Sequence, residues 1–203
     1  SPEDRNLDLL VKTVSKIYSC FFRTQSNILR FYPFLDRKLP EQIEFITSQE
    51  LEDLYPDLTP KERENRICRD KRAVFVIGIG NLLKRGEKHD GRDPDYDDWD
   101  LNGDILFWYP VLETDFEVSS MGIRVDSASM ERQLAESGET ARKVFPFHRV
   151  VIRGDLPLSA GGGIGQSRIF MFYLDKAHIG EVQSSVWPED MLRICRGSGI
   201  KLL

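Results

Sequence analysis

The sequence contains few cysteines, and their spacing excludes two common kinds of site. Cys20, Cys68 and Cys195 are the only three cysteines in 203 residues, and they lie far apart without a Cys-x-x-Cys pair. Structural zinc sites and secreted disulfide frameworks need more cysteines at closer spacing. We therefore expect free thiols in a reducing compartment, which favours a cytoplasmic protein.

The sequence also lacks an excess of positive charge and any long apolar run. It has 28 Lys and Arg against 33 Asp and Glu, for a net charge of −5. Such a balance does not favour a general nucleic-acid or membrane-surface binder. No apolar run approaches the length of a membrane span. The polar start, Ser1 to Arg5, is unlike a signal peptide, and because residue 1 is not methionine we expect a processed chain or part of a longer one.

A cluster of glycines is the most informative local feature. Gly161-Gly162-Gly163-Ile164-Gly165 precedes Gln166-Ser167-Arg168 and an apolar run. We expect a glycine-rich turn that leads into a helix, with Arg168 in the first helical turn, where an anion such as phosphate binds favourably. Neither a P-loop nor a Rossmann fingerprint fits, because Gln166 and Arg168 stand where those motifs need lysine and glycine. The alternative is a glycine-rich turn beside an ordinary surface arginine.

The periodicity of apolar residues predicts a mixture of helices and strands. Helices are expected from about Leu7 with Asn6 as N-cap, over 48–55, over 60–71 behind a Thr59–Glu62 capping box, over 127–136 and over 146–153. Strands are expected over 43–47, 73–80, 103–112, 116–125 and 182–187, with residues 113–115 as a hairpin turn and 84–100 as a surface loop. The fold class is therefore α+β.

The acidic segment before residue 104 has three interpretations, which are a calcium-binding loop, a solvated loop and a magnesium–nucleotide site. Asp98-x-Asp100-x-Asn102-Gly103 begins like an EF-hand loop, but its twelfth position is Tyr109 instead of glutamate. A solvated acidic loop is the plain alternative. We favour a magnesium–nucleotide site, in which Asp104 and Glu117, at the starts of two hairpin strands, act beside the glycine turn.

The second hairpin strand carries further polar residues. Ser120 and Arg124 share one face of a regular strand and Glu117 lies on the other, unless a bulge intervenes, and Met121-Gly122 is a candidate for that bulge. Arg124 suits a substrate carboxylate because its guanidinium binds such groups in a bidentate way. A surface ion pair is the alternative role of Arg124.

Several segments together resemble one family. They are residues 95–99, 101–106, 116–126, 161–168 and 178–183, and the resemblance runs from about Leu7 to Pro188. The segments resemble the ammonia-dependent asparagine synthetases, or aspartate–ammonia ligases, whose catalytic core is similar to that of class II aminoacyl-tRNA synthetases. The resemblance implies a mostly antiparallel synthetase-like sheet flanked by helices, with residues 1–203 as a single catalytic domain that lacks the N-terminal part of the family fold.

The resemblance also implies a reaction and a set of site residues. The family makes asparagine from aspartate, ammonia and ATP through a β-aspartyl-adenylate, with release of AMP and pyrophosphate, and it suggests a homodimer. The resemblance implies that Arg168 and Asp97 are catalytic and that Asp104 and Glu117 bind Mg²⁺. It implies that the substrate is bound by Arg124, Asp97 and Ser120. The residues implied to bind nucleotide are Gly161, Gly162, Gly163, Arg168, Glu117 and Ser120. Because no cysteine stands at the N-terminus to release ammonia from glutamine, free ammonia is the expected nitrogen source.

Two departures from the family leave two alternatives open. The first third of the family chain, which carries an arginine for the α-phosphate, has no counterpart here, and the loop between Trp99 and Leu101 is short. The alternatives are a class II synthetase catalytic domain that charges tRNA with aspartate or asparagine, and a non-catalytic nucleotide-binding module. The absence of a basic surface counts against the first. The histidines, which are His89, His148 and His178, are expected to be structural or exposed and not catalytic.

Overall fold

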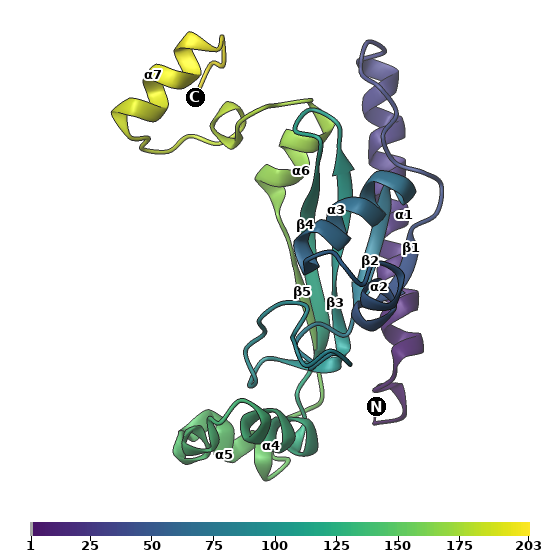
Figure 1. The fold of residues 1–203 in the computed structure, drawn as a ribbon, viewed down its shortest axis with the longest axis vertical. Coiled ribbons are helices and arrows are strands. Elements are labelled where there is room, and N and C mark those ends of the chain that lie inside the picture. The colour runs from purple at the N-terminus through teal and green to yellow at the C-terminus, as the bar shows by residue number, and fades with distance from the viewer. Residues whose placement is uncertain (1) are drawn as a thin grey trace.

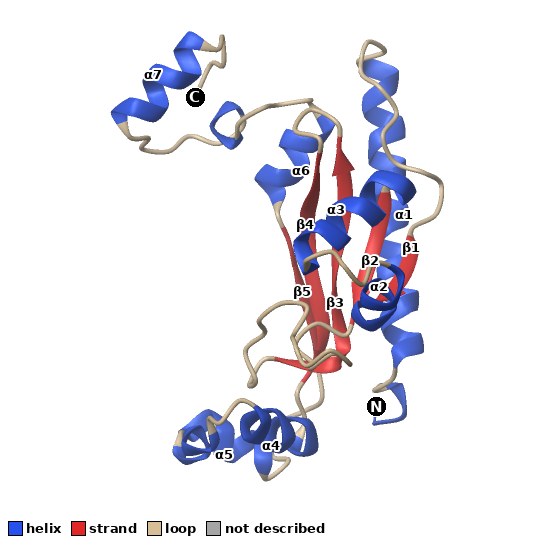
Figure 2. Ribbon diagram, viewed as in Figure 1, coloured by secondary structure: helices blue, strands red, loops and turns tan. Residues whose placement is uncertain are grey.

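The computed structural model describes residues 2–203 and is built on one five-stranded sheet (Figure 2). Ser1, the first residue of the polar start, lies outside the described residues. The strands are β1 (Glu44–Thr47), β2 (Ala73–Ile77), β3 (Asp97–Tyr109), β4 (Thr114–Arg124) and β5 (Ala160–Ile164), and they are ordered in the sheet as in the sequence. Only β1 and β2 pair in parallel, so the α+β, mostly antiparallel architecture is confirmed.

The part of the chain that the structure describes has seven α-helices, which cover the faces of the sheet or project from its ends (Figure 1). They are α1 (Leu7–Phe31), α2 (Ser48–Leu54), α3 (Pro60–Lys71), α4 (Ser127–Glu136), α5 (Pro146–Ile152), α6 (Gln166–Tyr173) and α7 (Glu189–Gly197). Helix α1 packs on one face of the sheet, and α2 and α3 pack on the other. The predicted caps are confirmed, because Asn6 accepts a hydrogen bond from Leu9 N–H and Thr59 and Glu62 form a capping box. None of the helices within residues 2–203 is both long and apolar enough to cross a membrane.

Alternation along the strands divides the interior into two hydrophobic layers. On β2, Ala73, Phe75 and Ile77 face α1, whereas Val74 and Val76 face α2 and α3. Burial of both faces explains why the sequence of this strand is a continuous apolar run. The same alternation continues on β3, which places even-numbered residues from 104 to 108 on the face of α2 and α3.

Phe107 occupies the centre of the layer beneath α1. Its ring lies 5.7 Å from the ring of Phe21 and 5.0 Å from that of Phe172, and its side chain is fully buried. We expect Phe107→Ala to lower the free energy of unfolding by about 3–5 kcal/mol, because the packed aromatic neighbours cannot collapse into the space. Urea denaturation monitored by circular dichroism measures this loss. The exposed Phe34 is the matched control, and a similar loss from Phe34→Ala would contradict the packing argument.

The structure corrects four of the sequence-based expectations. The glycine cluster forms strand β5 and not a turn, because each glycine from 161 to 163 pairs with β4. Strand β3 begins at Asp97, so the end of the predicted surface loop lies inside the sheet. The hairpin loop covers residues 110–113, so it begins three residues earlier than the expected loop over 113–115. The strand predicted over 182–187 was wrong: these residues are irregular, and they lie between a 3₁₀ turn, Ile179–Glu181, and α7, which was not predicted.

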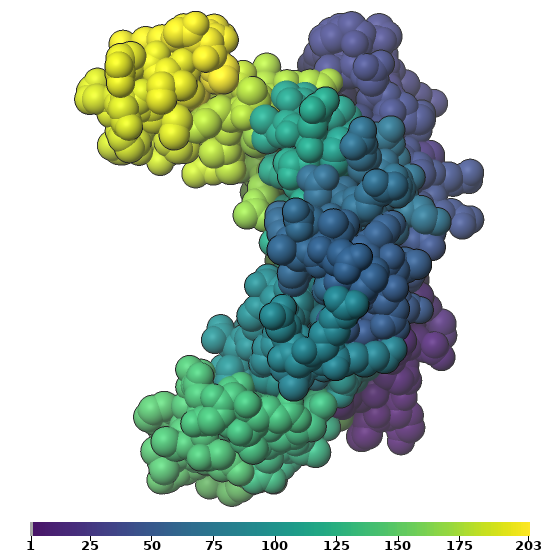
Figure 3. Space-filling model, in the orientation of Figure 1, coloured from purple at the N-terminus to yellow at the C-terminus, as the bar shows by residue number. Residues whose placement is uncertain are grey.

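The molecule has the shape of a crescent (Figure 3). Helices α4 and α5 project from one end of the sheet and α7 from the other, so that a hollow opens between them along the side where β5 lies (Figures 1 and 3). The hollow is where the predicted site residues of β4 and β5 are found.

Candidate functional site

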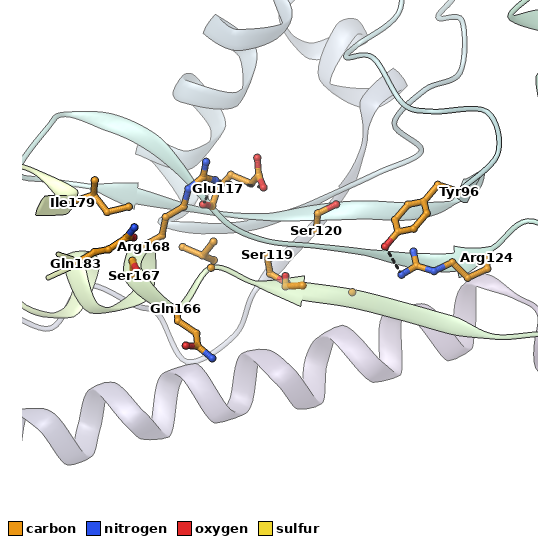
Figure 4. A pocket seen from close by; sticks show the side chains of 14 residues that line it. Tyr96, Glu117, Ser119, Ser120, Arg124, Gln166, Ser167, Arg168, Ile179 and Gln183 are labelled. Atoms are coloured by element: carbon orange, nitrogen blue, oxygen red, sulfur yellow. Dashed lines mark hydrogen bonds and ion pairs between the residues drawn. The ribbon is translucent and has the colours of Figure 1, made fainter. Parts of the chain in front are cut away.

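A cavity of about 540 Å³ lies over β4, β5 and the start of α6. Its lining includes most of the residues predicted from the sequence, which are Glu117, Ser120, Arg124, Gly162, Gly163 and Arg168. Figure 4 shows Ser120 between a pair formed by Glu117 and Arg168 and a second pair formed by Tyr96 and Arg124. The cavity therefore has two charged ends joined by a small hydroxyl side chain.

A bulge in β4 brings Glu117 to the cavity. Glu117 pairs with Leu106 and Ser119 pairs with Ile105, which leaves Val118 as one extra residue. Because the extra residue reverses the alternation, Glu117 projects on the same face as Ser120. The bulge expected at Met121-Gly122 was wrongly placed, since that stretch pairs regularly with β3. The need for a bulge was predicted and its position was not.

Arg168 defines one end of the cavity. It lies in the first turn of α6, as predicted, where the unpaired N–H groups of the helix favour an anion. Its Nη1 donates to the backbone oxygen of Glu117 at 2.9 Å and lies 3.5 Å from the Glu117 carboxylate. The Arg168 side chain is 46% exposed, so the rest of its guanidinium is accessible to a ligand.

Arg124 defines the other end. Its Nη1 forms an ion pair with Asp97, and its Nη2 donates to the Tyr96 hydroxyl at 2.9 Å. The guanidinium carbon lies 3.9 Å from the centre of the Tyr96 ring. Burial raises the pKa of the Asp97 carboxyl, and the bond from Arg124 opposes that rise. Asp97 itself does not line the cavity and acts on it through Arg124.

Asp104 lies in a neighbouring cavity of about 330 Å³, whose lining also includes Glu117. The two carboxylates are not directly paired, because Asp104 stands opposite Ser120 and Glu117 stands opposite Leu106. Burial raises the pKa of Asp104, while an ion pair with Arg92 and a hydrogen bond from Ser120 oppose the rise. Glu117 joins the two cavities.

These two carboxylates fit a magnesium ion only as part of its coordination shell. Among residues 2–203 no group of three or more His, Cys, Asp or Glu side chains is placed to hold a metal. Mg²⁺ typically takes one or two carboxylates and completes its shell with phosphate oxygens and water. Asp104 and Glu117 fall short of a metal cage, and they would supply only part of the shell of an ion that is also bound to nucleotide.

Glycine in β5 is required by close approaches on both faces of the strand. A Cβ at residue 162 would lie 2.4 Å from the Cβ of Met121, whereas a Cβ at residue 163 would enter open space. At residue 161 a Cβ would lie 2.5 Å from Nη2 of Arg124. The glycines therefore let the strand pack closely and leave room for the Arg124 guanidinium and for a ligand.

Substitution of two adjacent glycines separates packing from ligand binding. We expect Gly162→Ala to lower the free energy of unfolding by about 1–3 kcal/mol, because the strand must move away from Met121. Gly163→Ala should leave stability nearly unchanged and weaken ATP binding, since its methyl group projects into the cavity. Thermal unfolding and calorimetric titration with ATP measure the two effects. Equal stability losses in the two variants would contradict this assignment.

Tyr96, which lines the cavity, and Arg92, which contacts Asp104, are among the residues near the site that the sequence did not reveal. Tyr96 and Arg92 both lie in the segment interpreted as a surface loop. The only sequence signal was an aromatic ring between Asp95 and Asp97, which is unusual for a solvated acidic loop. Nothing in the sequence alone shows that Arg92 reaches the buried Asp104.

The three histidines have structural partners, as expected. His89 Nε2 lies 3.0 Å from Glu64, and His148 Nε2 lies 2.9 Å from Asp95. His178 caps a 3₁₀ turn by accepting a hydrogen bond from Gly180 N–H. His89 is buried despite its place in a polar loop, because α3 covers it through Glu64.

Comparison with known protein families gives a match along nearly all of the chain. Residues 1–199 match the family model described as aspartate-ammonia ligase. The chain is 58% identical over 200 residues to aspartate–ammonia ligase of Bacillus cereus strain G9842, and 57% identical to that of Bacillus mycoides strain KBAB4. Each alignment covers 98% of this chain and 61% of the relative, so the chain spans about three-fifths of the length of these relatives.

Comparison with solved structures identifies the fold. Aspartyl-tRNA synthetase from Entamoeba histolytica matches with a TM-score of 0.58 and 17% identity, over 88% of this chain and 40% of that one. Asparaginyl-tRNA synthetase from the same organism, in complex with asparaginyl-adenylate, matches with a TM-score of 0.54 and 15% identity, over 90% of this chain and 43% of that one. The fold is therefore that of a class II synthetase, as the sequence predicted.

Proposed function

The chain belongs to the aspartate–ammonia ligase family, and we propose that it makes asparagine from aspartate, ammonia and ATP, with residues 1–203 acting as one catalytic domain. The observation that carries the proposal is the convergence of Glu117, Ser120, Arg124 and Arg168 on one cavity through the Val118 bulge. Two arginines on either side of a small hydroxyl side chain suit two substrates bound side by side, one with phosphates at one end of the cavity and the other with a carboxylate at the opposite end.

The proposed reaction has two steps. The side-chain carboxylate oxygen of aspartate attacks the α-phosphorus of ATP, pyrophosphate leaves, and a β-aspartyl-adenylate results. Ammonia then attacks the acyl carbon, AMP leaves, and the ammonium proton is lost to solvent or a nearby base. Both steps depend on orientation and on neutralisation of charge, so positioned arginines supply most of what the chemistry needs.

We assign Arg168 to the phosphates of ATP. Its exposed guanidinium stands at the N-terminus of α6, so a positive side chain and unpaired helical N–H groups act on the same anion. The backbone of Gly162 and Gly163 and the Ser120 hydroxyl would line the nucleotide, since the extended strand brings no side chain into the cavity at residue 163. Gly161, which was also expected to bind nucleotide, is not part of the cavity lining and lies against the Arg124 guanidinium. Asp104 and Glu117 would hold Mg²⁺ together with the phosphates, where the ion neutralises charge on the leaving pyrophosphate.

We assign Arg124 to a carboxylate of aspartate. The Tyr96 ring and the Asp97 carboxylate already fix its guanidinium, so little orientation is left for the substrate to impose. Asp97 does not line the cavity, contrary to the expectation that it faces the amino-acid and ammonia end, and we propose that it acts there by holding the Arg124 guanidinium. A cytoplasmic location and a homodimer complete the proposal, by the family resemblance and the free thiols.

Product analysis tests the proposed function. The protein is incubated with aspartate and ATP, with and without ammonium and with and without tRNA. We expect AMP and asparagine that depend on ammonium and not on tRNA. Aspartyl-tRNA or asparaginyl-tRNA as the product would support a synthetase instead, and ATP binding without turnover would support a non-catalytic module. Sedimentation velocity on the same sample measures the oligomeric state, for which a dimer is expected.

A further inference from the structure

Arg92 lies beside Asp104, which lines the second cavity. It belongs to the segment before β3, and its Nη2 forms an ion pair with the buried carboxylate of Asp104. Only 23% of the Arg92 side chain is exposed. Its Nε is buried and makes no hydrogen bond within the part of the chain that the structure describes. The guanidinium is thus held by charge and has an unused donor.

Several carboxylates act on this one guanidinium. Burial opposes its positive charge, but Asp104, Asp90 and Glu117 outweigh the effect of burial and raise the pKa of Arg92. The positive charge of Arg92 also acts to lower the pKa of Asp97. The guanidinium therefore supplies positive charge at Asp104, whereas Glu117 has its own ion-pair partner in Arg168.

A second buried arginine shows how an ordinary structural ion pair differs. Arg63 lies 3.8 Å from Glu52, and its Nε donates to the backbone oxygen of Tyr55 at 3.1 Å. That guanidinium is bound to the surrounding backbone, whereas the contacts of Arg92 include no such backbone bond among the described residues. Arg92 is therefore freer to move when its carboxylate partner is engaged by another cation.

We propose that Arg92 is an internal counter-ion that neutralises Asp104 before nucleotide binds and prevents a divalent cation from binding alone beside the Asp104 and Glu117 carboxylates. This inference rests on the proposed function, because it gives those carboxylates a role in holding the metal. The phosphates of ATP bring the negative charge that is missing. With them in place, the cation and Arg92 no longer compete for Asp104, and the released guanidinium can contact a phosphate.

Coulomb repulsion gives the proposal its physical basis. A divalent ion beside Asp104 would stand close to a fixed positive charge at a buried carboxylate, where such repulsion is only partly screened. Two carboxylates are also fewer ligands than a stable protein-only magnesium site has. The chain alone therefore binds the metal weakly, and nucleotide and metal strengthen each other's binding by the same factor.

Binding of Mn²⁺ alone tests the proposal without any catalytic readout. Free Mn²⁺ is measured by electron paramagnetic resonance during titration of the wild-type protein, Arg92→Met and Arg92→Lys. Arg132→Met is the matched control, because Arg132 also pairs with carboxylates, those of Asp98 and Asp100, away from the cavity. Circular dichroism checks the fold of each variant, and Arg92→Gln replaces the methionine variant should that one unfold.

The expected result is a gain of metal binding on loss of the arginine. Arg92→Met should bind Mn²⁺ roughly tenfold or more tightly than wild type, because the competing charge is gone. Arg92→Lys and Arg132→Met should stay near wild type. The gain should disappear in Arg92→Met combined with Asp104→Asn. Equal affinity of wild type and Arg92→Met, or a gain that survives loss of the Asp104 charge, would overturn the proposal.

The test separates this inference from the proposed reaction. Failure of the wild-type protein to make asparagine, together with the expected Mn²⁺ results, would defeat the reaction and leave the counter-ion in place. Asparagine formation without any change of Mn²⁺ affinity in Arg92→Met would leave the reaction standing and defeat the counter-ion.

Discussion

Arg168→Ala is expected to reduce aspartate-dependent pyrophosphate exchange by about 10²–10³-fold, the usual cost of removing a positioned donor to a developing charge. The reason is that Arg168 is the one arginine placed on the α6 N-terminus and open to the cavity. The variant should fold normally, because its side chain is nearly half exposed and contacts only Glu117 in the hydrogen bonds and ion pairs of the described chain.

Exchange of radiolabelled pyrophosphate into ATP measures the adenylation step without the ammonia step. Arg153→Ala is the matched control, since Arg153 is exposed and pairs with Asp155 outside the cavity. Unchanged exchange in Arg168→Ala would remove Arg168 from the phosphate site. A fall of the same size in Arg153→Ala would show that the assay reports a general charge effect.

Arg124→Met is expected to raise the KM for aspartate by about 10²-fold, because a charge-assisted bidentate contact of about 2–3 kcal/mol is lost. A cost in stability should accompany it. Asp97 is 5% exposed, and the substitution leaves its buried carboxylate without its arginine partner.

The double variant Arg124→Met with Asp97→Asn separates the two effects. Neutralising Asp97 should recover most of the lost stability, because no buried charge is left unpaired. It should not recover the KM for aspartate, because the guanidinium is still absent. Urea denaturation and initial rates at varied aspartate measure the two quantities. Recovery of both would mean that Arg124 serves the fold and does not bind substrate.

The parts of the fold that the sequence predicted are those governed by local chemistry. The N-cap at Asn6 and the capping box at Thr59 depend on side chains a few residues apart, and both are visible in the sequence. The continuous apolar run of β2 likewise predicted a strand buried on both faces. Helix α7 was missed because its acidic first turn follows a proline in a segment that otherwise suggested an ending strand.

Strand β5 shows where local chemistry misleads. Glycine disfavours strands, so a run of three glycines predicts a turn. Here the strand forms because β4 approaches so closely that a side chain at residue 162 would meet Met121. Such a requirement arises from the partner strand and cannot be seen in residues 160–164 alone.

The sequence indicated several residues of the candidate site but did not show how those residues are arranged in space. Glu117, Arg124 and Arg168 were singled out by residue type and Ser120 by the family resemblance, and these four line one cavity, whereas Asp97, Asp104 and Gly161 do not line it. Their common face depends on a bulge at Val118, and bulges are fixed by pairing across strands. Arg92 was missed for the same reason, because its contact with Asp104 joins a loop to a strand interior.

Transfer of an oxygen isotope tests the central claim most directly. The protein is supplied with ATP, ammonium and aspartate labelled with ¹⁸O in its side-chain carboxylate, and the products are analysed by mass spectrometry. Attack of that carboxylate on the α-phosphorus predicts asparagine and AMP, with one labelled oxygen carried into the AMP phosphate. Labelled inorganic phosphate with ADP, or AMP that carries no label, would contradict a β-aspartyl-adenylate in this cavity.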